Sequence, residues 1–196
     1  TLYGAAHLLL GRQGPVVLEV PPIADRYWSV AAHDAGFGVF AVFSARSVGQ
    51  GGGAFLLVPP GWQGERPEGI TTVHESPTSA VCLLQRIYCR SVAEVPDLHA
   101  VQDAITVTSL DRWRRGEPGT DPVDTADWRL EGVRLTTDPL DLFRLTARFR
   151  ADDPVRPADT ALQHLFRSVG VGWGATPPGD ADVLDALRAG ARDAQH

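Results

Sequence analysis

Six polar or aromatic residues lie in or beside stretches that otherwise have the composition of apolar strands, and they are the candidates for chemistry: Tyr3, Arg26, Tyr27, Asp34, Trp62 and Arg86. Stability alone favours aliphatic residues in such strands, and a charge there needs a partner because burying it unpaired is costly. A Trp between glycines can also stack on a ring-shaped ligand. We therefore predict that the six residues bind a small molecule. The competing interpretation is that the charged residues form structural ion pairs and that Trp62 plugs one end of the fold.

Catalytic and metal-binding signatures are absent from the sequence. Asp25, Arg26 and Asp34 carry groups suited to general acid and base catalysis, but a structural ion pair is the simpler interpretation. The six histidines show no metal-ligand spacing and there is no Cys-x-x-Cys, so no metal is predicted; only an assembly of His33 and His74 in the fold is left open. There is no Gly-x-Ser-x-Gly nucleophile motif. The glycine run 49–53 lacks the Lys and Ser/Thr of a phosphate-binding loop, and no cofactor is predicted.

Composition limits the class of protein and its partners. The chain has 196 residues, of which 43% are hydrophobic and 21% charged, as in ordinary globular proteins. A net charge of -6 argues against nucleic acid as a partner, because that surface needs clustered basic residues. No apolar run approaches the roughly 20 residues that span a bilayer. The chain contains no Met and opens on Thr1, so we expect a processed product or a part of a longer protein.

The two cysteines are not expected to form a disulfide. Residues 80–89 have the composition of one strand, which separates Cys82 from Cys89 by more than about 20 Å, whereas a disulfide requires about 6 Å between Cα atoms. Unpaired thiols favour a reducing compartment such as the cytoplasm. The localisation is not otherwise indicated.

The elements that position these residues are strands first and helices afterwards. Apolar, β-branched runs predict strands at residues 16–20, 26–34, 39–43, 54–58, 70–74 and 80–89. Apolar spacing of three and four predicts helices at about 96–105, 138–149, 157–170 and 180–187, and residues 128–135 are ambiguous. We predict a β-sandwich domain at 1–110, a linker at 111–127 and a helical segment at 128–196.

Several short motifs occur in an order that resembles a known family. They are Thr1-Leu2-Tyr3, Gly14 to Pro21, Asp25-Arg26-Tyr27-Trp28, Asp34, Gly52 to Val58, Pro60 to Gly64, Ser76-Pro77-Thr78, Arg86 and His99 to Asp103. Together they resemble bacterial domain-of-unknown-function family 1254 over about residues 1–110. The resemblance implies a jelly-roll-like antiparallel β-sandwich, commonly followed by a second sandwich of family 1214, which is missing here. The chain is then either a fragment or a short single-domain form. The family implies no settled activity and no catalytic residues.

Three functions remain open at this stage. The leading prediction is a β-sandwich that binds a small molecule or carbohydrate. The alternatives are a cofactor-independent lyase or cyclase, which requires an apolar pocket holding a carboxylate with a shifted pKa, and a structural or assembly module that pairs as a homo-oligomer.

Overall fold

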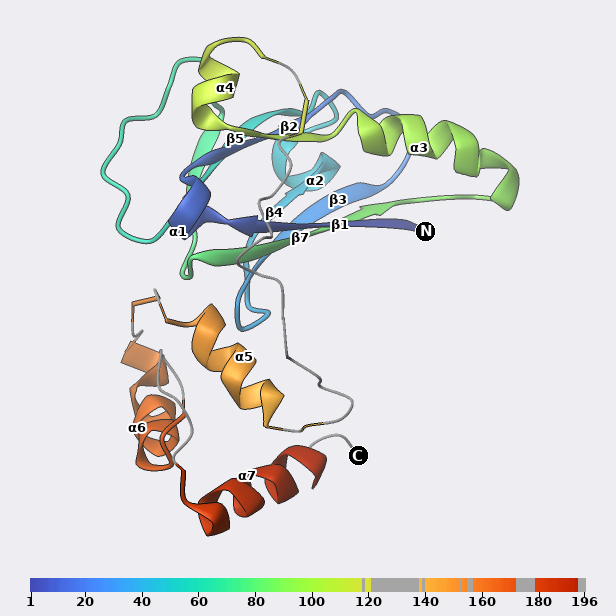
Figure 1. Cartoon of the computed structure of the whole chain (residues 1–196). Helices are drawn as coiled ribbons and strands as arrows, with labels where there is room; N and C mark the ends of the chain where they lie inside the picture. The colour runs from blue at the N-terminus through green and yellow to red at the C-terminus, as the bar shows by residue number, and fades with distance from the viewer. Residues whose placement is uncertain are drawn as a thin grey trace. The chain divides into compact units, whose positions relative to one another are not determined.

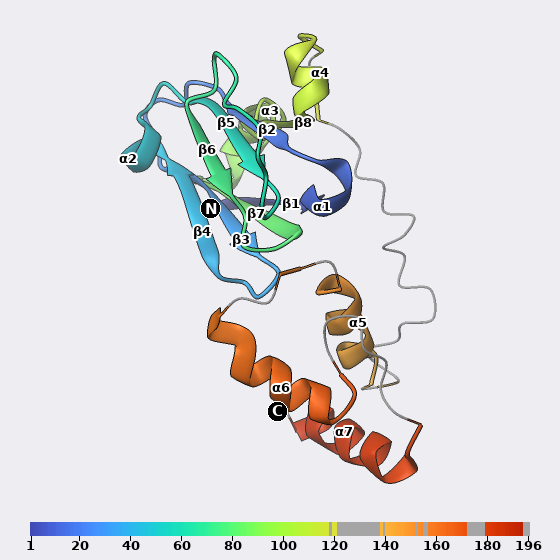
Figure 2. The same ribbon diagram turned by 90° about the vertical axis from the view of Figure 1, so that its left-hand side faces the viewer.

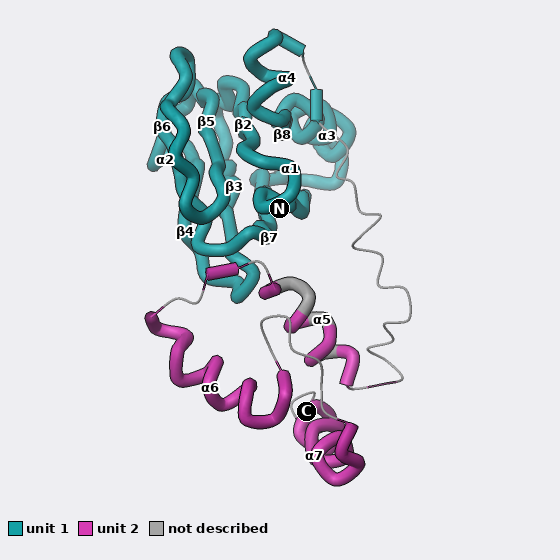
Figure 3. The backbone as a smooth tube through the Cα atoms, turned by 60° about the vertical axis from the view of Figure 1, so that its left-hand side comes forward, with its two compact units in different colours: residues 1–123 teal, residues 124–196 magenta. Residues whose placement is uncertain are grey.

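The computed structural model describes residues 1–117, 119–120, 138, 140–151, 153–154, 157–171 and 179–193, with backbone alone at 142, 145, 148 and 149. The chain divides into two units, residues 1–123 and 124–196, coloured teal and magenta in Figure 3. The predicted domain boundaries at 110 and 128 stay a prediction. A short helix, α4 (Leu110–Arg114), overlaps the start of the predicted linker at 111–127.

The first unit consists of two four-stranded sheets (Figures 1 and 2). Sheet A has the order β1-β7-β3-β4, with β1 at Leu2–Leu9, β7 at Ala80–Ile87, β3 at Trp28–Asp34 and β4 at Val39–Ser44. Sheet B has the order β6-β5-β2-β8, with β6 at Thr72–Glu75, β5 at Gly53–Val58, β2 at Val16–Val20 and β8 at Thr106–Ser109. The mainly β architecture followed by helices is therefore confirmed.

The main core lies between the two sheets. Leu18, Phe55 and Leu57 of sheet B belong to one buried cluster with Val30, Phe43 and Leu83 of sheet A. The rings of Phe43 and Phe55 meet across the two sheets at 4.7 Å between centroids. Alternation along each strand places these side chains on the inner faces, and their burial from water stabilises the sandwich.

One strand pair departs from the predicted antiparallel arrangement. The pairs of sheet A and the pairs β2–β5 and β2–β8 are antiparallel, but β5 and β6 run parallel, with Leu57 opposite His74. A parallel pair needs a long connection, and residues 59–71 provide it. The jelly-roll topology stays a prediction.

A second, smaller cluster covers the outer face of sheet B. Val17, Leu56 and Val58 point away from the main core and are buried with Ile70 and Leu110. Trp62 from the 59–71 connection and Trp113 from α4 pack against this cluster. The long connection and α4 thus shield an apolar sheet face that would otherwise be exposed to water.

Short helices connect the strands of the first unit. They are α1 (Leu10–Gln13), α2 (Ala45–Val48), the 3-10 turn η1 (Val92–Glu94) and α3 (Val95–Asp103). In α3, Leu98 is buried in the main core and Val101 packs against it. The predicted helix at 96–105 is therefore present, with its apolar face turned towards the sandwich.

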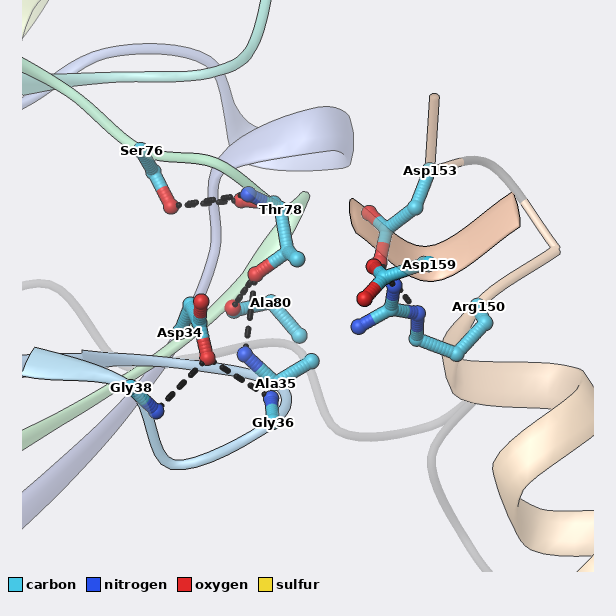
Figure 4. Close-up of polar contacts among 10 residues, drawn as sticks. All are labelled: Asp34, Ala35, Gly36, Gly38, Ser76, Thr78, Ala80, Arg150, Asp153 and Asp159. Carbon is cyan, nitrogen blue, oxygen red and sulfur yellow. Dashed lines mark hydrogen bonds and ion pairs between the residues drawn. The ribbon is translucent and has the colours of Figure 1, made fainter. Parts of the chain in front are cut away.

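The second unit contains helices α5 (Asp141–Phe149), η3 (Pro157–Asp159), α6 (Thr160–Ser168) and α7 (Ala181–Asp193). Arg150 is buried and forms ion pairs with Asp153 at 3.4 Å and Asp159 at 3.1 Å, which tie the end of α5 to η3 (Figure 4). The ambiguous segment at 128–135 lies outside the described residues. Within the described part of the chain, no helix is long and apolar enough to cross a membrane.

Candidate ligand-binding site

A cavity of about 280 Å³ opens between the edge strands of the two sheets, β1 of sheet A and β8 of sheet B, and we call it the edge cavity. Its lining residues are Tyr3, Gly4, Ala5, Ala6, Leu18, Val30, Leu83, Gln85, Gln102, Ile105, Val107 and Thr120. The volume is close to the lower limit of about 300 Å³ for small-molecule sites. The edge cavity is therefore large enough for a compact ligand.

The walls of the edge cavity are continuous with the main core. Leu18 of β2, Val30 of β3 and Leu83 of β7 belong to the buried cluster between the sheets, and each also lines the cavity. Val107 closes the side of sheet B. A ligand in this space is therefore surrounded mainly by aliphatic side chains. Binding an apolar ligand removes apolar surface of both the ligand and the cavity from water, which favours the complex.

Gln85 supplies a polar group at an inner position of β7. The neighbouring inner residues of that strand, Leu83 and Ile87, are apolar. Gln85 lies opposite Gly4 of β1, and a Cβ at Gly4 would lie 2.6 Å from its Oε1. The missing side chain at Gly4 therefore gives the Gln85 amide its space.

Gln102 supplies a second amide from α3. Its Nε2 donates a hydrogen bond of 3.1 Å to the backbone oxygen of Tyr3, and its Oε1 lies 3.2 Å from Nδ1 of His99. On the opposite side, Oγ1 of Thr120 accepts a hydrogen bond of 3.3 Å from the backbone N–H of Val107. Gln102 thus fastens α3 to β1 beside the cavity.

The chemistry of the edge cavity is that of neutral recognition. Its described lining residues include no Asp, Glu, Arg or His. Across the described part of the chain, no group of three or more His, Cys, Asp or Glu residues is arranged to hold a metal ion. The arrangement offers apolar contact and amide hydrogen bonds, and it suits a ligand without charge.

Tyr3 and Arg86 are neighbours in the structure. They lie opposite each other in the β1–β7 register, and the Arg86 guanidinium carbon is 5.6 Å from the centroid of the Tyr3 ring. A cation above an aromatic face is weakly stabilising at an exposed site, and both side chains are exposed. Of the six predicted site residues, Tyr3 alone lines the edge cavity.

Arg26 and Tyr27 lie before β3, which begins at Trp28 and not at Arg26 as predicted. Asp25 adopts a positive φ of 60°, which interrupts the extended backbone ahead of them. Arg26 forms an ion pair of 3.6 Å with Glu94. The hydroxyl of Tyr27 donates a hydrogen bond of 3.1 Å to Oγ of Ser29. Both residues have local structural partners.

Asp34 is buried at the turn between β3 and β4, where its Oδ1 accepts hydrogen bonds from the backbone N–H groups of Gly36 at 2.8 Å and Gly38 at 2.9 Å (Figure 4). Thr78 braces the same turn, because its Oγ1 accepts from the N–H of Ala35 at 2.9 Å and donates to the oxygen of Ala80 at 2.7 Å. The carboxylate therefore stabilises a turn.

Trp62 belongs to the cluster on the outer face of sheet B and not to the edge cavity. Its ring lies against the backbone of Gly64, where a Cβ would come within 2.1 Å of the ring. The structure thus brings Tyr3 and Arg86 together, but it does not bring the six residues to one place.

Gln85 and Gln102 were missed in the sequence. Gln85 had a signal, because it is the one polar residue among the alternate inner positions Val81, Leu83, Gln85 and Ile87 of an apolar strand. Gln102 lies in the motif His99 to Asp103, but the motif does not indicate its place beside β1, which depends on how α3 packs against residues that are far apart in the sequence.

Fold and cavity together define a two-sheet β-sandwich protein with a ligand-sized opening between two sheet edges. Residues 1–109 match the model of a family described as "Protein of unknown function (DUF1254)". The chain belongs to this family, which confirms the resemblance found in the sequence.

A crystal structure of the VPA0106 protein from Vibrio parahaemolyticus is similar to the chain, with a TM-score of 0.72 and 24% sequence identity. The similarity covers 100% of this chain but 47% of that protein, so the chain spans about half of its length. At this identity the likeness establishes the fold alone. No curated protein matches the chain.

Proposed function

We propose that the protein binds a small, uncharged and largely apolar molecule in the edge cavity. The observation that carries the proposal is the combination of aliphatic walls with the two amide side chains of Gln85 and Gln102. Apolar contact supplies the driving force for such a ligand, and a few placed polar groups supply its orientation.

A carbohydrate is the less favoured ligand. Sugars present hydroxyl groups on most of their surface, and burying a hydroxyl without a hydrogen bond is costly. The apolar walls formed by Leu18, Val30 and Leu83 offer no partners for several hydroxyl groups. The lyase or cyclase alternative requires a carboxylate in the pocket, and the described lining residues of the edge cavity do not include one.

Indole is a suitable probe, because it is neutral, flat and mainly apolar and carries one N–H donor. We expect saturation-transfer NMR to detect indole bound to the wild-type chain. Replacing Ala6, which lines the cavity, with Leu fills the space, so Ala6→Leu removes the signal. Ala31→Leu, which adds the same atoms at a position that does not line the cavity, leaves it unchanged.

Two results count against the proposal. Equal binding of indole by the wild type and Ala6→Leu means that the probe binds elsewhere. Binding of methyl β-glucopyranoside in place of indole means that the ligand is a carbohydrate. Circular dichroism of both variants establishes that they are folded.

Homo-oligomerisation is a second candidate, favoured by exposed apolar side chains of sheet A and its β3–β4 turn. Phe37 is 73% exposed, Tyr3 59% and Val42 47%. Light scattering over a dilution series tests this candidate with Val42→Lys as the disrupting variant. A wild-type chain that stays monomeric at every concentration contradicts it.

A further inference from the structure

The outer edge of β1 is open beside the edge cavity. β1 is the last strand of sheet A and pairs with β7 in an uninterrupted antiparallel register from Leu2 to Leu9. In such a pair, the N–H and C=O of alternate residues point away from the partner strand. The oxygen of Tyr3 accepts from Gln102, and the N–H of Leu9 donates to Oε1 of Gln13 at 3.0 Å. The odd-numbered residues therefore face outward.

Ala5 lies between these two bonded positions, and it lines the cavity. Its N–H and C=O face outward by the same alternation, and no residue in the described ranges forms a hydrogen bond with them. Ala5 is exposed, so water reaches both groups in the free chain and a ligand can replace it. Ala5 thus offers one donor and one acceptor side by side at the cavity.

β1 is the longest of the four edge strands, and its sequence carries none of the features that usually protect an edge. Edges are usually protected by short strands, charges, Pro or bulges. β6 and β8 have 4 residues each, and the register between β3 and β4 shifts at Ala32 and His33. β1 has 8 residues and contains no Asp, Glu, Lys, Arg or Pro. Its sequence leaves the edge available to an added strand.

The Gln85 amide completes the set of polar groups. Among the described residues it has no hydrogen-bond partner, although it lines the cavity at an inner position of sheet A. A primary amide carries both donors and an acceptor. The cavity therefore presents two donor–acceptor pairs, one at Ala5 and one at Gln85, within aliphatic walls. Secondary amides have the complementary pattern.

We propose that the ligand is a short, uncharged peptide-like compound that adds to β1 as an extended strand. One ligand residue exchanges N–H···O=C hydrogen bonds with Ala5 in both directions, as in an antiparallel pair. An apolar group at the next ligand position, which points to the opposite face of the added strand, enters the space beside Leu18, Leu83 and Val107. The Gln85 amide binds a further amide group. The inference rests on the proposed function, because it specifies the chemistry of a ligand in the same cavity.

The test uses N-acetyl-glycine N′-isobutylamide, whose glycine pairs with Ala5 and whose isobutyl group enters the cavity, and its analogue in which oxygen replaces the glycine N–H. The analogue cannot donate to the oxygen of Ala5. We expect the diamide to bind about fivefold or more tightly than the analogue, since leaving a polar group unsatisfied has at least that effect on binding. Heteronuclear NMR titration measures both affinities on the wild-type chain. Equal affinities overturn the inference.

A pair of variants tests the protein side of the contact. Ala5→Pro removes the donor at the edge, where Pro is tolerated because the N–H is not part of the ladder. Ala5→Ser keeps the donor and serves as the matched control. We expect Ala5→Pro to reduce diamide binding about fivefold or more relative to Ala5→Ser. Unchanged diamide binding by Ala5→Pro contradicts the contact.

Indole separates failure of this inference from failure of the proposed function. If indole binds and Ala6→Leu blocks it, but the diamide and its analogue bind equally, the cavity is a binding site and strand addition is wrong. If neither indole nor the diamide binds, the proposed function itself fails. If the free chain dimerises and Ala5→Pro abolishes the dimer, β1 pairs with a second copy and the peptide assignment is overturned.

Discussion

Replacing Asp34 tests whether this predicted site residue binds a ligand or stabilises the fold. Its Oδ1 accepts two backbone hydrogen bonds, of 2.8 Å from Gly36 and 2.9 Å from Gly38. Hydrogen bonds to a charged group contribute about 1.5–3 kcal/mol each. The lower figure applies here, because both glycines are exposed and water can replace part of the loss. Asp34→Ala should therefore lower the free energy of unfolding by about 3 kcal/mol.

Asp34→Asn is the discriminating variant, because its side-chain oxygen keeps the acceptor while the charge is lost. We expect it to cost about 1 kcal/mol, the difference between a charge-assisted and a neutral pair of bonds. Urea unfolding followed by tryptophan fluorescence measures both values, since Trp28 is fully buried in the same unit.

Asp111→Ala is the matched control, because its side chain is 83% exposed and its effect should stay within about 0.5 kcal/mol. If Asp34→Ala lowers the free energy of unfolding by less than about 1 kcal/mol, or if Asp34→Asn lowers it as much as Asp34→Ala does, the carboxylate does not stabilise the turn as described. If instead Asp34→Asn keeps full stability and loses ligand binding, Asp34 is a ligand group.

Three further predictions concern single positions of the first unit. Burial lowers the pKa of His74, because it disfavours the charged imidazolium. The stability that depends on neutral His74 is therefore present above the unfolded pKa of about 6.5 and is lost as the pH falls through the folded pKa. The thermal unfolding temperature should fall more steeply from about pH 7.5 to 5 in the wild type than in His74→Gln. Gly52 has a φ of 66°, and a Cβ there would lie 2.0 Å from the backbone oxygen of Val20. Gly52→Ala should therefore lower the free energy of unfolding in urea by about 3 kcal/mol or more. Gly51→Ala is the control and should be nearly neutral, because a Cβ at Gly51 would meet open space. Burial raises the pKa of the Cys82 thiol, so iodoacetamide should modify it more slowly in the folded chain than in urea, as followed by mass spectrometry; equal rates contradict this.

The strands β2, β4 and β5 of the core could be predicted from the sequence, whereas β1 and β8, which border the edge cavity, could not. The runs at β2, β4 and β5 are rich in Val, Phe and Leu, which suit a buried pleated surface. β1 was not among the predicted strands, because Gly4, Ala5 and Ala6 have weak strand preference. β8 was missed because it has 4 residues directly after α3. Both are edge strands, and their place is set by pairing with distant segments.

The candidate site depended on information that local patterns do not carry. The sequence marked Tyr3 and Arg86 as candidates, and in the structure their guanidinium and ring are in contact on the outer face of sheet A. Arg26 forms an ion pair, Asp34 accepts backbone hydrogen bonds and Trp62 packs on the outer face of sheet B, so all three have contacts within the fold. The cavity arises from the strand order, which places β1 and β8 at corresponding edges, and no motif encodes that order.

The β1–β7 register also has a consequence for how the chain folds during synthesis. Leu2 pairs with Ile87, so β1 finds its partner only after most of the first unit has left the ribosome, whereas Val16 of β2 can pair earlier with Leu57 of β5. Such distant pairing makes folding slow, because long loops must close before the contacts form. The β3–β4 hairpin is the local unit that can form early. Until Ile87 emerges, β1 has no strand partner and its apolar side chains are open to other nascent chains, so aggregation is favoured during this interval.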